Sequence, residues 1–99
     1  MEIKVDEVYS FKLNSGEELI AKVKSVDDSY IMVEEPVSVA PNPQGMGLIP
    51  SLFTAEHRGL VRLNTNSIAI LAITEDNIKM KYLEATTGIK VPSKKIVLG

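Results

Sequence analysis

Two short turn sequences stand ten residues apart in this chain, and their spacing constrains the fold more than any other feature. Segments 14–16 (NSG) and 27–29 (DDS) consist of turn-forming residues, because Gly reaches positive φ and Asn, Asp and Ser bond to nearby backbone. Between them, Leu19, Ala21 and Val23 mark one face of a strand, and Lys22 and Lys24 point the other way, with Ile20 beside them. Two turns around one strand make an antiparallel meander, and a long central strand coils around a small core. We therefore predict a strongly bent sheet with its first three strands near 11–13, 19–24 and 30–33.

Two further strands are expected downstream, at 60–63 and 68–73. Segment 64–66 (NTN) between them is a tight turn, since Asn tolerates the left-handed region. Segment 68–73 (IAILAI) is apolar on both faces, so it has to be covered by a neighbouring element or by another protomer. The predicted fold class is mostly β: a five-stranded, strongly bent antiparallel sheet or small open barrel over about 7–73.

A helix is predicted after the barrel, at about 75–87. Thr74 caps its start and acidic residues follow in the first turn. Ile78, Tyr82 and Ala85 form an apolar stripe at helical spacing, and Gly88 is a natural stop. We expect this helix to cover strand 68–73. The tail, 88–99, is expected to be either mobile or paired with a sheet edge.

The connection 36–58 is expected to be an inserted loop. Pro36 should end the third strand, because proline has no donor for the ladder. Segment 48–53 (LIPSLF) is apolar, but Pro50 excludes it from a central strand. It either folds back over the barrel or contacts a partner. Residues 1–6 alternate apolar and charged, which fits a short extra strand or a frayed arm.

Composition places limits on what the chain does. Its 99 residues make one domain, 1–99. The net charge of -2 excludes bulk coating of nucleic acid, so any such site must be local. Cysteine is absent, which excludes disulfides and thiolate metal sites. With no basic-apolar leader and no apolar run of 18 residues, the prediction is a cytoplasmic protein (host cytoplasm if viral) without membrane contact.

Catalytic and metal chemistry is not expected. His57 is the single histidine, and one imidazole without cysteine makes a poor metal site, so we interpret it as a surface residue. The acidic pairs 17–18, 27–28 and 34–35 point to opposite faces on a strand or serve as solvated turn residues. No phosphate loop or nucleophile elbow occurs. The sequence predicts no enzyme, no cofactor and no metal.

Segment 11–30 resembles the first motif of the Sm/LSm family, the small ring-forming RNA-binding proteins that include bacterial Hfq. The matching positions follow without a gap, with Ala21 in place of the family's bending glycine. They are Phe11, Leu13, Gly16, Leu19, Ala21, Val23, Asp27 and Tyr30. Segment 63–66 (LNTN) stands where the second motif has Ile-Arg-Gly-Asn; a gapped alternative aligns 61–64. A helix after the barrel looks like short Sm-like proteins of tailed phages.

The resemblance implies a homo-oligomeric ring of about five to seven subunits, closed by pairing of the fourth and fifth strands. It also implies binding of single-stranded RNA or DNA at the pore and a role in RNA or DNA processing. The implied nucleic-acid-binding residues are Asp27, Tyr30, Asn64, Asn66 and Arg62. An aromatic face stacks bases and amides pair with base edges. Ile31, at the family's base-reading position, cannot hydrogen-bond a base.

Alternatives remain for both residues and function. Tyr30 is either a stacking residue or a strand aromatic with its ring on the core, and Asp27 is either a base contact or a turn cap. An SH3-like barrel is the nearest alternative fold. The alternative function is a structural or protein-interaction module that uses the apolar segment 48–53 and binds no nucleic acid.

Overall fold

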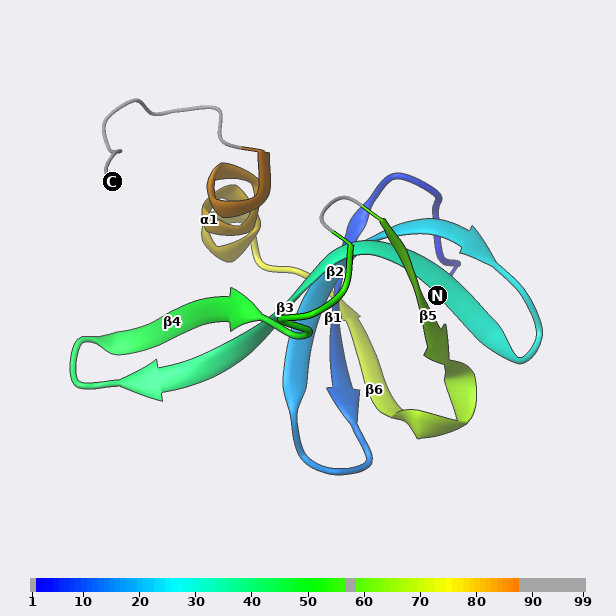
Figure 1. Ribbon diagram of the computed structural model, residues 1–99, viewed down its shortest axis with the longest axis horizontal. Helices are drawn as coiled ribbons and strands as arrows, with labels where there is room; N and C mark the ends of the chain where they lie inside the picture. Colours follow the sequence, from blue (N-terminus) through cyan, green and yellow to red (C-terminus); the bar gives the residue numbers. More distant parts are fainter. Residues whose placement is uncertain (1, 57–58, 88–99) are drawn as a thin grey trace.

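The computed structural model describes residues 2–56 and 59–87, and it confirms the predicted fold class. The chain forms a bent antiparallel sheet followed by one helix, as Figure 1 shows. The sequence-predicted tail 88–99 and His57 lie outside the described residues. The elements in order are β1 (Val8–Leu13), β2 (Glu18–Val26), β3 (Tyr30–Asn42), β4 (Gly45–Pro50), β5 (Leu60–Asn64), the 3₁₀ turn η1 (Thr65–Ser67), β6 (Ile68–Ile73) and α1 (Asp76–Thr87).

The sheet follows the order β4-β3-β2-β1-β6, with β5 also paired to β3. The β1–β2 hairpin turns at Gly16, whose φ of 96° only glycine adopts easily. No described residues pair with the outer edges of β5 and β6, so the barrel stays open between them. Residues 2–7 contribute no strand, but they are not a frayed arm either: the Asp6 amide donates to the Val23 carbonyl (2.6 Å), and Ile3 packs against the hydrophobic core.

Strand β3 is the longest element, and the prediction that Pro36 ends it is wrong. It continues to Asn42 and changes partner on the way: its first half pairs with β5 and its second half with β4. At the change, the register against β2 shifts, so that Glu35 and Pro36 together face Ala21. Proline fits this bulge because no ladder donor is required there. Glu35 has φ 51°, a left-handed conformation that bends the strand.

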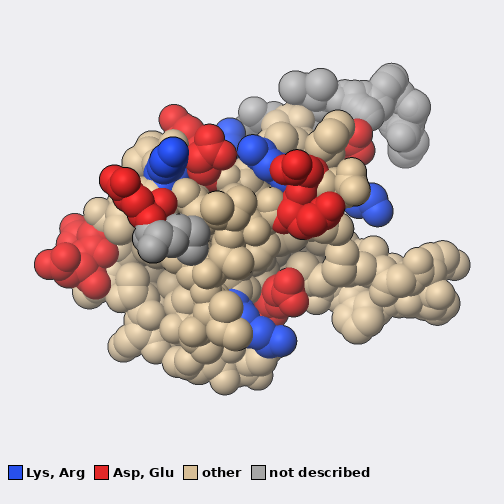
Figure 2. Space-filling model, turned by 180° about the vertical axis from the view of Figure 1, so that it is seen from behind, with Lys and Arg blue, Asp and Glu red and all other residues tan. Residues whose placement is uncertain are grey.

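The second half of β3 and β4 form a hairpin that projects from the barrel (Figure 1). We call this hairpin, residues 37–50, the arm. The arm makes the sheet six-stranded rather than five-stranded, and it occupies more than half of the predicted loop 36–58. Pro50 is compatible with it because β4 is an edge strand. Residues 36–55 carry no charge, and the arm is uniformly tan in Figure 2.

Each face of the sheet carries one buried hydrophobic cluster. On the inner face, the curl of the sheet encloses a core that includes Phe11, Val23 and Val33, each at most 1% exposed. On the outer face, α1 packs on Val8, Ile20 and Val37. Ile20 is therefore buried although its neighbours in sequence point into the inner core.

The helix covers a different surface from the one predicted. Tyr82, Ile78 and Leu83 pack on the outer faces of β1, β2 and β3, not on β6. Strand β6 stays open, with Ile70 58% and Ile73 72% exposed. The amphipathic stripe identified the buried side of the helix, but it carries no information about which apolar surface receives it.

Tyr82 fastens the helix to the bend in β3. Its hydroxyl accepts a hydrogen bond from the Lys22 amide (3.1 Å) and donates one to the Glu34 carbonyl (2.9 Å). These backbone groups flank the bulge, where the β2–β3 ladder is interrupted. Burial raises the pKa of Tyr82 far above its usual range, so the hydroxyl keeps the proton that it donates to Glu34.

We predict that Tyr82→Phe lowers the free energy of unfolding by about 1–3 kcal/mol, because it leaves two buried backbone groups without a partner. Urea unfolding at a fixed protein concentration measures this change. The matched control is Tyr30→Phe, which removes a hydroxyl without a hydrogen bond among the described residues and should change stability by less than about 0.5 kcal/mol. Equal effects of the two substitutions would contradict the role of Tyr82.

Candidate nucleic-acid interface

The outward face of the β3–β5 pair carries three of the predicted site residues. In β3, Ile31 and Val33 are buried in the inner core, so Tyr30 points to the opposite side because side chains alternate along a strand. Tyr30 faces Asn64 across the ladder, and Met32 faces Arg62. Directly opposed residues share a face of an antiparallel pair. Tyr30, Arg62 and Asn64 therefore form one surface, which we call the Tyr30 face.

Tyr30 and Arg62 are in direct contact. The guanidinium carbon of Arg62 lies 4.2 Å from the centroid of the Tyr30 ring, within the range of a cation–π interaction. Tyr30 is half-buried and Arg62 is exposed. The ring is thus held at the surface, outside the core, which excludes the alternative of a core-facing Tyr30.

The 27–29 turn and the 3₁₀ turn η1 lie side by side. The Thr65 amide donates to the Ser29 carbonyl (3.0 Å), and the Thr65 hydroxyl donates to the Asp28 carbonyl (3.3 Å). Asp27 is exposed beside them, and its carboxylate accepts from the Asp28 amide (2.7 Å). Asp27 therefore caps its own turn and also lies next to Tyr30, whose carbonyl accepts from the Asp27 amide (2.9 Å).

Asn66 belongs to a different neighbourhood from the other site residues. The Asn14 side-chain amide donates to the Asn66 carbonyl (2.8 Å), and the Asn14 backbone amide donates to the Ser67 carbonyl (2.8 Å). Asn66 thus borders the β1–β2 turn, while Asn64 and Thr65 border the β2–β3 turn. Its own side chain is exposed. The structure brings together Asp27, Tyr30, Asn64 and Arg62, with Asn66 at the far end of η1.

Sequence reasoning missed the two residues that hold η1 in place. Thr65 stands where the second Sm/LSm motif has glycine. It holds the 27–29 turn through both its amide and its hydroxyl. Asn14 is a typical turn former, yet its side chain also donates to a carbonyl 52 positions away in the sequence. Short polar side chains in turns bond both locally and across the fold, so the sequence signal exists but does not name the partner.

Other chemistry can be described only for residues 2–56 and 59–87. Within these ranges, no group of three or more His, Asp or Glu side chains is arranged to hold a metal ion. No helix there is long and apolar enough to cross a bilayer.

The sequence matches no protein-family model and no curated protein. The resemblance to the Sm/LSm family therefore stays a prediction from the sequence.

We predict a coupling free energy of about 0.5–1 kcal/mol between Tyr30 and Arg62, the usual strength of an exposed cation–π pair. A double-mutant cycle with Tyr30→Leu and Arg62→Gln, followed by urea unfolding, measures it. The control cycle pairs Tyr30→Leu with Lys12→Gln on β1, where we expect no coupling. A coupling equal to that of the control cycle would show that the two side chains do not interact in solution.

Proposed function

We propose that the protein is an Sm-like, ring-forming protein that binds single-stranded nucleic acid on the Tyr30 face. One observation carries the proposal: an outward tyrosine ring lies under a guanidinium and across the ladder from an amide side chain. A site for single-stranded nucleic acid uses these three kinds of group. The ring stacks a base, the cation attracts phosphate, and the amide pairs with a base edge.

We expect the proposed site to distinguish only weakly between nucleotide sequences. Ile31, at the position of the family's base-reading residue, is 2% exposed and reaches no ligand. Asn64 supplies one amide, and stacking on Tyr30 accepts any base. Arg62, over the Tyr30 ring, supplies a local positive charge that attracts phosphate in a chain of net charge -2. We therefore expect modest, salt-sensitive affinity for both RNA and DNA strands.

Ring formation is supported by the two open edges of the sheet. The outer edges of β5 and β6 have no partner among the described residues, and Leu60, Ile70 and Ile73 are each more than half exposed. Unpaired apolar edges attract another chain. Pairing β5 of one copy with β6 of the next is a head-to-tail contact, which closes into a ring when the rotation permits. Such a ring repeats the Tyr30 face once per subunit.

We predict that Tyr30→Ala weakens binding of labelled oligo-U and oligo-A by roughly 5- to 150-fold, since one stacked base contributes about 1–3 kcal/mol. Fluorescence anisotropy titration at two salt concentrations measures the loss. The control is Met46→Ala on the arm, which should bind like the wild type. Unchanged binding by Tyr30→Ala, or no salt-sensitive binding by the wild type, argues against the nucleic-acid site.

We predict that the wild type is an oligomer of about five to seven subunits at micromolar concentration and that Ile70→Lys dissociates it. A charge on the open edge of β6 opposes edge pairing. Light scattering with native mass measurement reports the subunit number. Met80→Lys is the matched control, because Met80 is similarly exposed (60%) but lies on α1. A monomeric wild type contradicts the ring, and equal dissociation by both variants contradicts the proposed edge.

The second candidate function is a protein-interaction module without nucleic acid. It is favoured by the exposure of the segment at the base of the arm: Ile49 is 44%, Leu52 51% and Phe53 79% exposed. The absorbance ratio of the purified protein separates the two functions. RNA that copurifies with the wild type but not with Tyr30→Ala supports nucleic-acid binding. A wild type that purifies without nucleic acid, together with a protein partner that Phe53→Ser no longer binds, supports the interaction module.

A further inference from the structure

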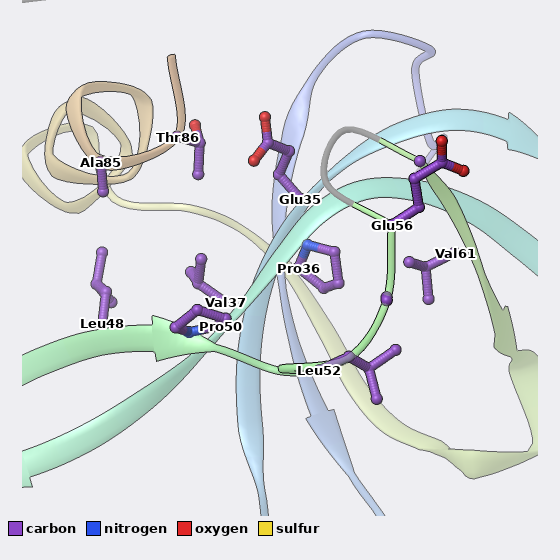
Figure 3. Close-up of a pocket in the computed structure, with 12 residues that line it drawn as sticks. Glu35, Pro36, Val37, Leu48, Pro50, Leu52, Glu56, Val61, Ala85 and Thr86 are labelled. Atoms are coloured by element: carbon purple, nitrogen blue, oxygen red, sulfur yellow. The ribbon is translucent and has the colours of Figure 1, made fainter. Parts of the chain in front are cut away.

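A cavity of about 230 Å³ lies at the root of the arm, on the helix side of the sheet. Its apolar wall comes from β3, β4, the loop that follows β4, and β5. Figure 3 shows these residues around the proline ring of Pro36. They are Pro36, Val37, Leu48, Pro50, Leu52 and Val61. None of the apolar residues of this wall contributes to the Tyr30 face, so the cavity is a separate site.

Two carboxylates stand at this cavity. Glu35 and Glu56 both line it, and in Figure 3 both carboxylate groups stand on the same side of the Pro36 ring, away from Leu52. Neither forms an ion pair with a residue that the structure describes. An apolar wall with acidic groups at one side selects an occupant that combines aliphatic and basic side chains.

The end of α1 forms the remaining wall. Ala85 and Thr86 line the cavity, and the helix ends one residue later, at Thr87. Residues 88–99 follow Thr87 directly in the chain. Twelve residues span at most about 40 Å when extended, so this segment has ample length to reach a cavity that Ala85 and Thr86 line.

The composition of residues 88–99 complements the cavity. The sequence GIKVPSKKIVLG contains five aliphatic residues and three lysines, and it contains no acidic residue. Aliphatic and basic residues alternate at 89–91 and adjoin at 94–98. Within a chain of net charge -2, this segment contributes +3 from its lysines, whereas residues 36–55 contribute no charge.

We propose that the C-terminal segment, residues 88–99, docks in the cavity of its own chain. Its aliphatic side chains contact the wall formed by Val37, Leu48 and Leu52. Its lysines pair with the carboxylates of Glu35 and Glu56. The occupied cavity joins the arm, the loop after β4 and the helix into one unit, so the segment fixes the direction in which the arm projects.

Disulfide trapping in the full chain tests this proposal, and the absence of native cysteine makes the result unambiguous. One cysteine replaces Ala55, which lines the cavity, and the other replaces Val97 in the C-terminal segment. The control pair combines Val97→Cys with Ser15→Cys, an exposed position in the β1–β2 turn. We expect the cavity pair to form an intrachain disulfide faster than the control pair, at a rate that does not depend on protein concentration.

Charge reversal in variants that carry the Ala55→Cys and Val97→Cys pair gives a second readout. Lys94→Glu with Lys95→Glu should slow intrachain trapping roughly three- to five-fold, as expected for loss of partly exposed ion pairs. Adding Glu35→Lys and Glu56→Lys should restore it. Trapping no faster than in the control pair overturns the proposal, and so does a disulfide that forms only between two chains. Neither result depends on whether the protein binds nucleic acid.

Discussion

The bend in β3 is the constraint on which the rest of this structure depends. One strand pairs with β2 along one edge and with two different strands along the other, β5 before the bend and β4 after it. Glu35 turns the chain in a left-handed conformation, and Pro36 occupies the position where a ladder donor is not needed. The interrupted ladder leaves backbone groups that the Tyr82 hydroxyl satisfies from the helix. The bend and the docking of α1 therefore stabilise each other.

Two surfaces follow from this bend. Before it, the sheet curls around Phe11 and Val23 and holds Tyr30 on the outside, and the outer edges of β5 and β6 stay unpaired within residues 2–56 and 59–87. After it, β3 and β4 leave the barrel as an uncharged arm. The first surface supports the proposed ring and nucleic-acid site. The second, with α1, encloses the cavity at the root of the arm.

Much of the barrel was predictable because its signals are local. The 14–16 and 27–29 turns, the alternation along β2 and the helix start after Thr74 each depend on residues adjacent in sequence. The site was partly predictable for the same reason, since Tyr30 and Asn64 flank turns. The continuation of β3 past Pro36 was not predictable. Proline normally ends a strand, and here the strand continues only because Pro36 lies in a bulge and β4 pairs with the residues after it. The surface that α1 covers depends on the location of Tyr82 in the fold, which no pattern within the helix specifies.

Residue-level amide hydrogen exchange along β5 and β6 tests the central claim most directly. The claim is that the bend leaves two sheet edges that pair between copies of the chain. Pairing predicts that the outward amides of β5 and β6 exchange slowly at micromolar protein concentration and faster on dilution, while β4 at the edge of the arm shows no such dependence. Outward amides of β5 and β6 that exchange as fast as those of β4 at every concentration would contradict the account.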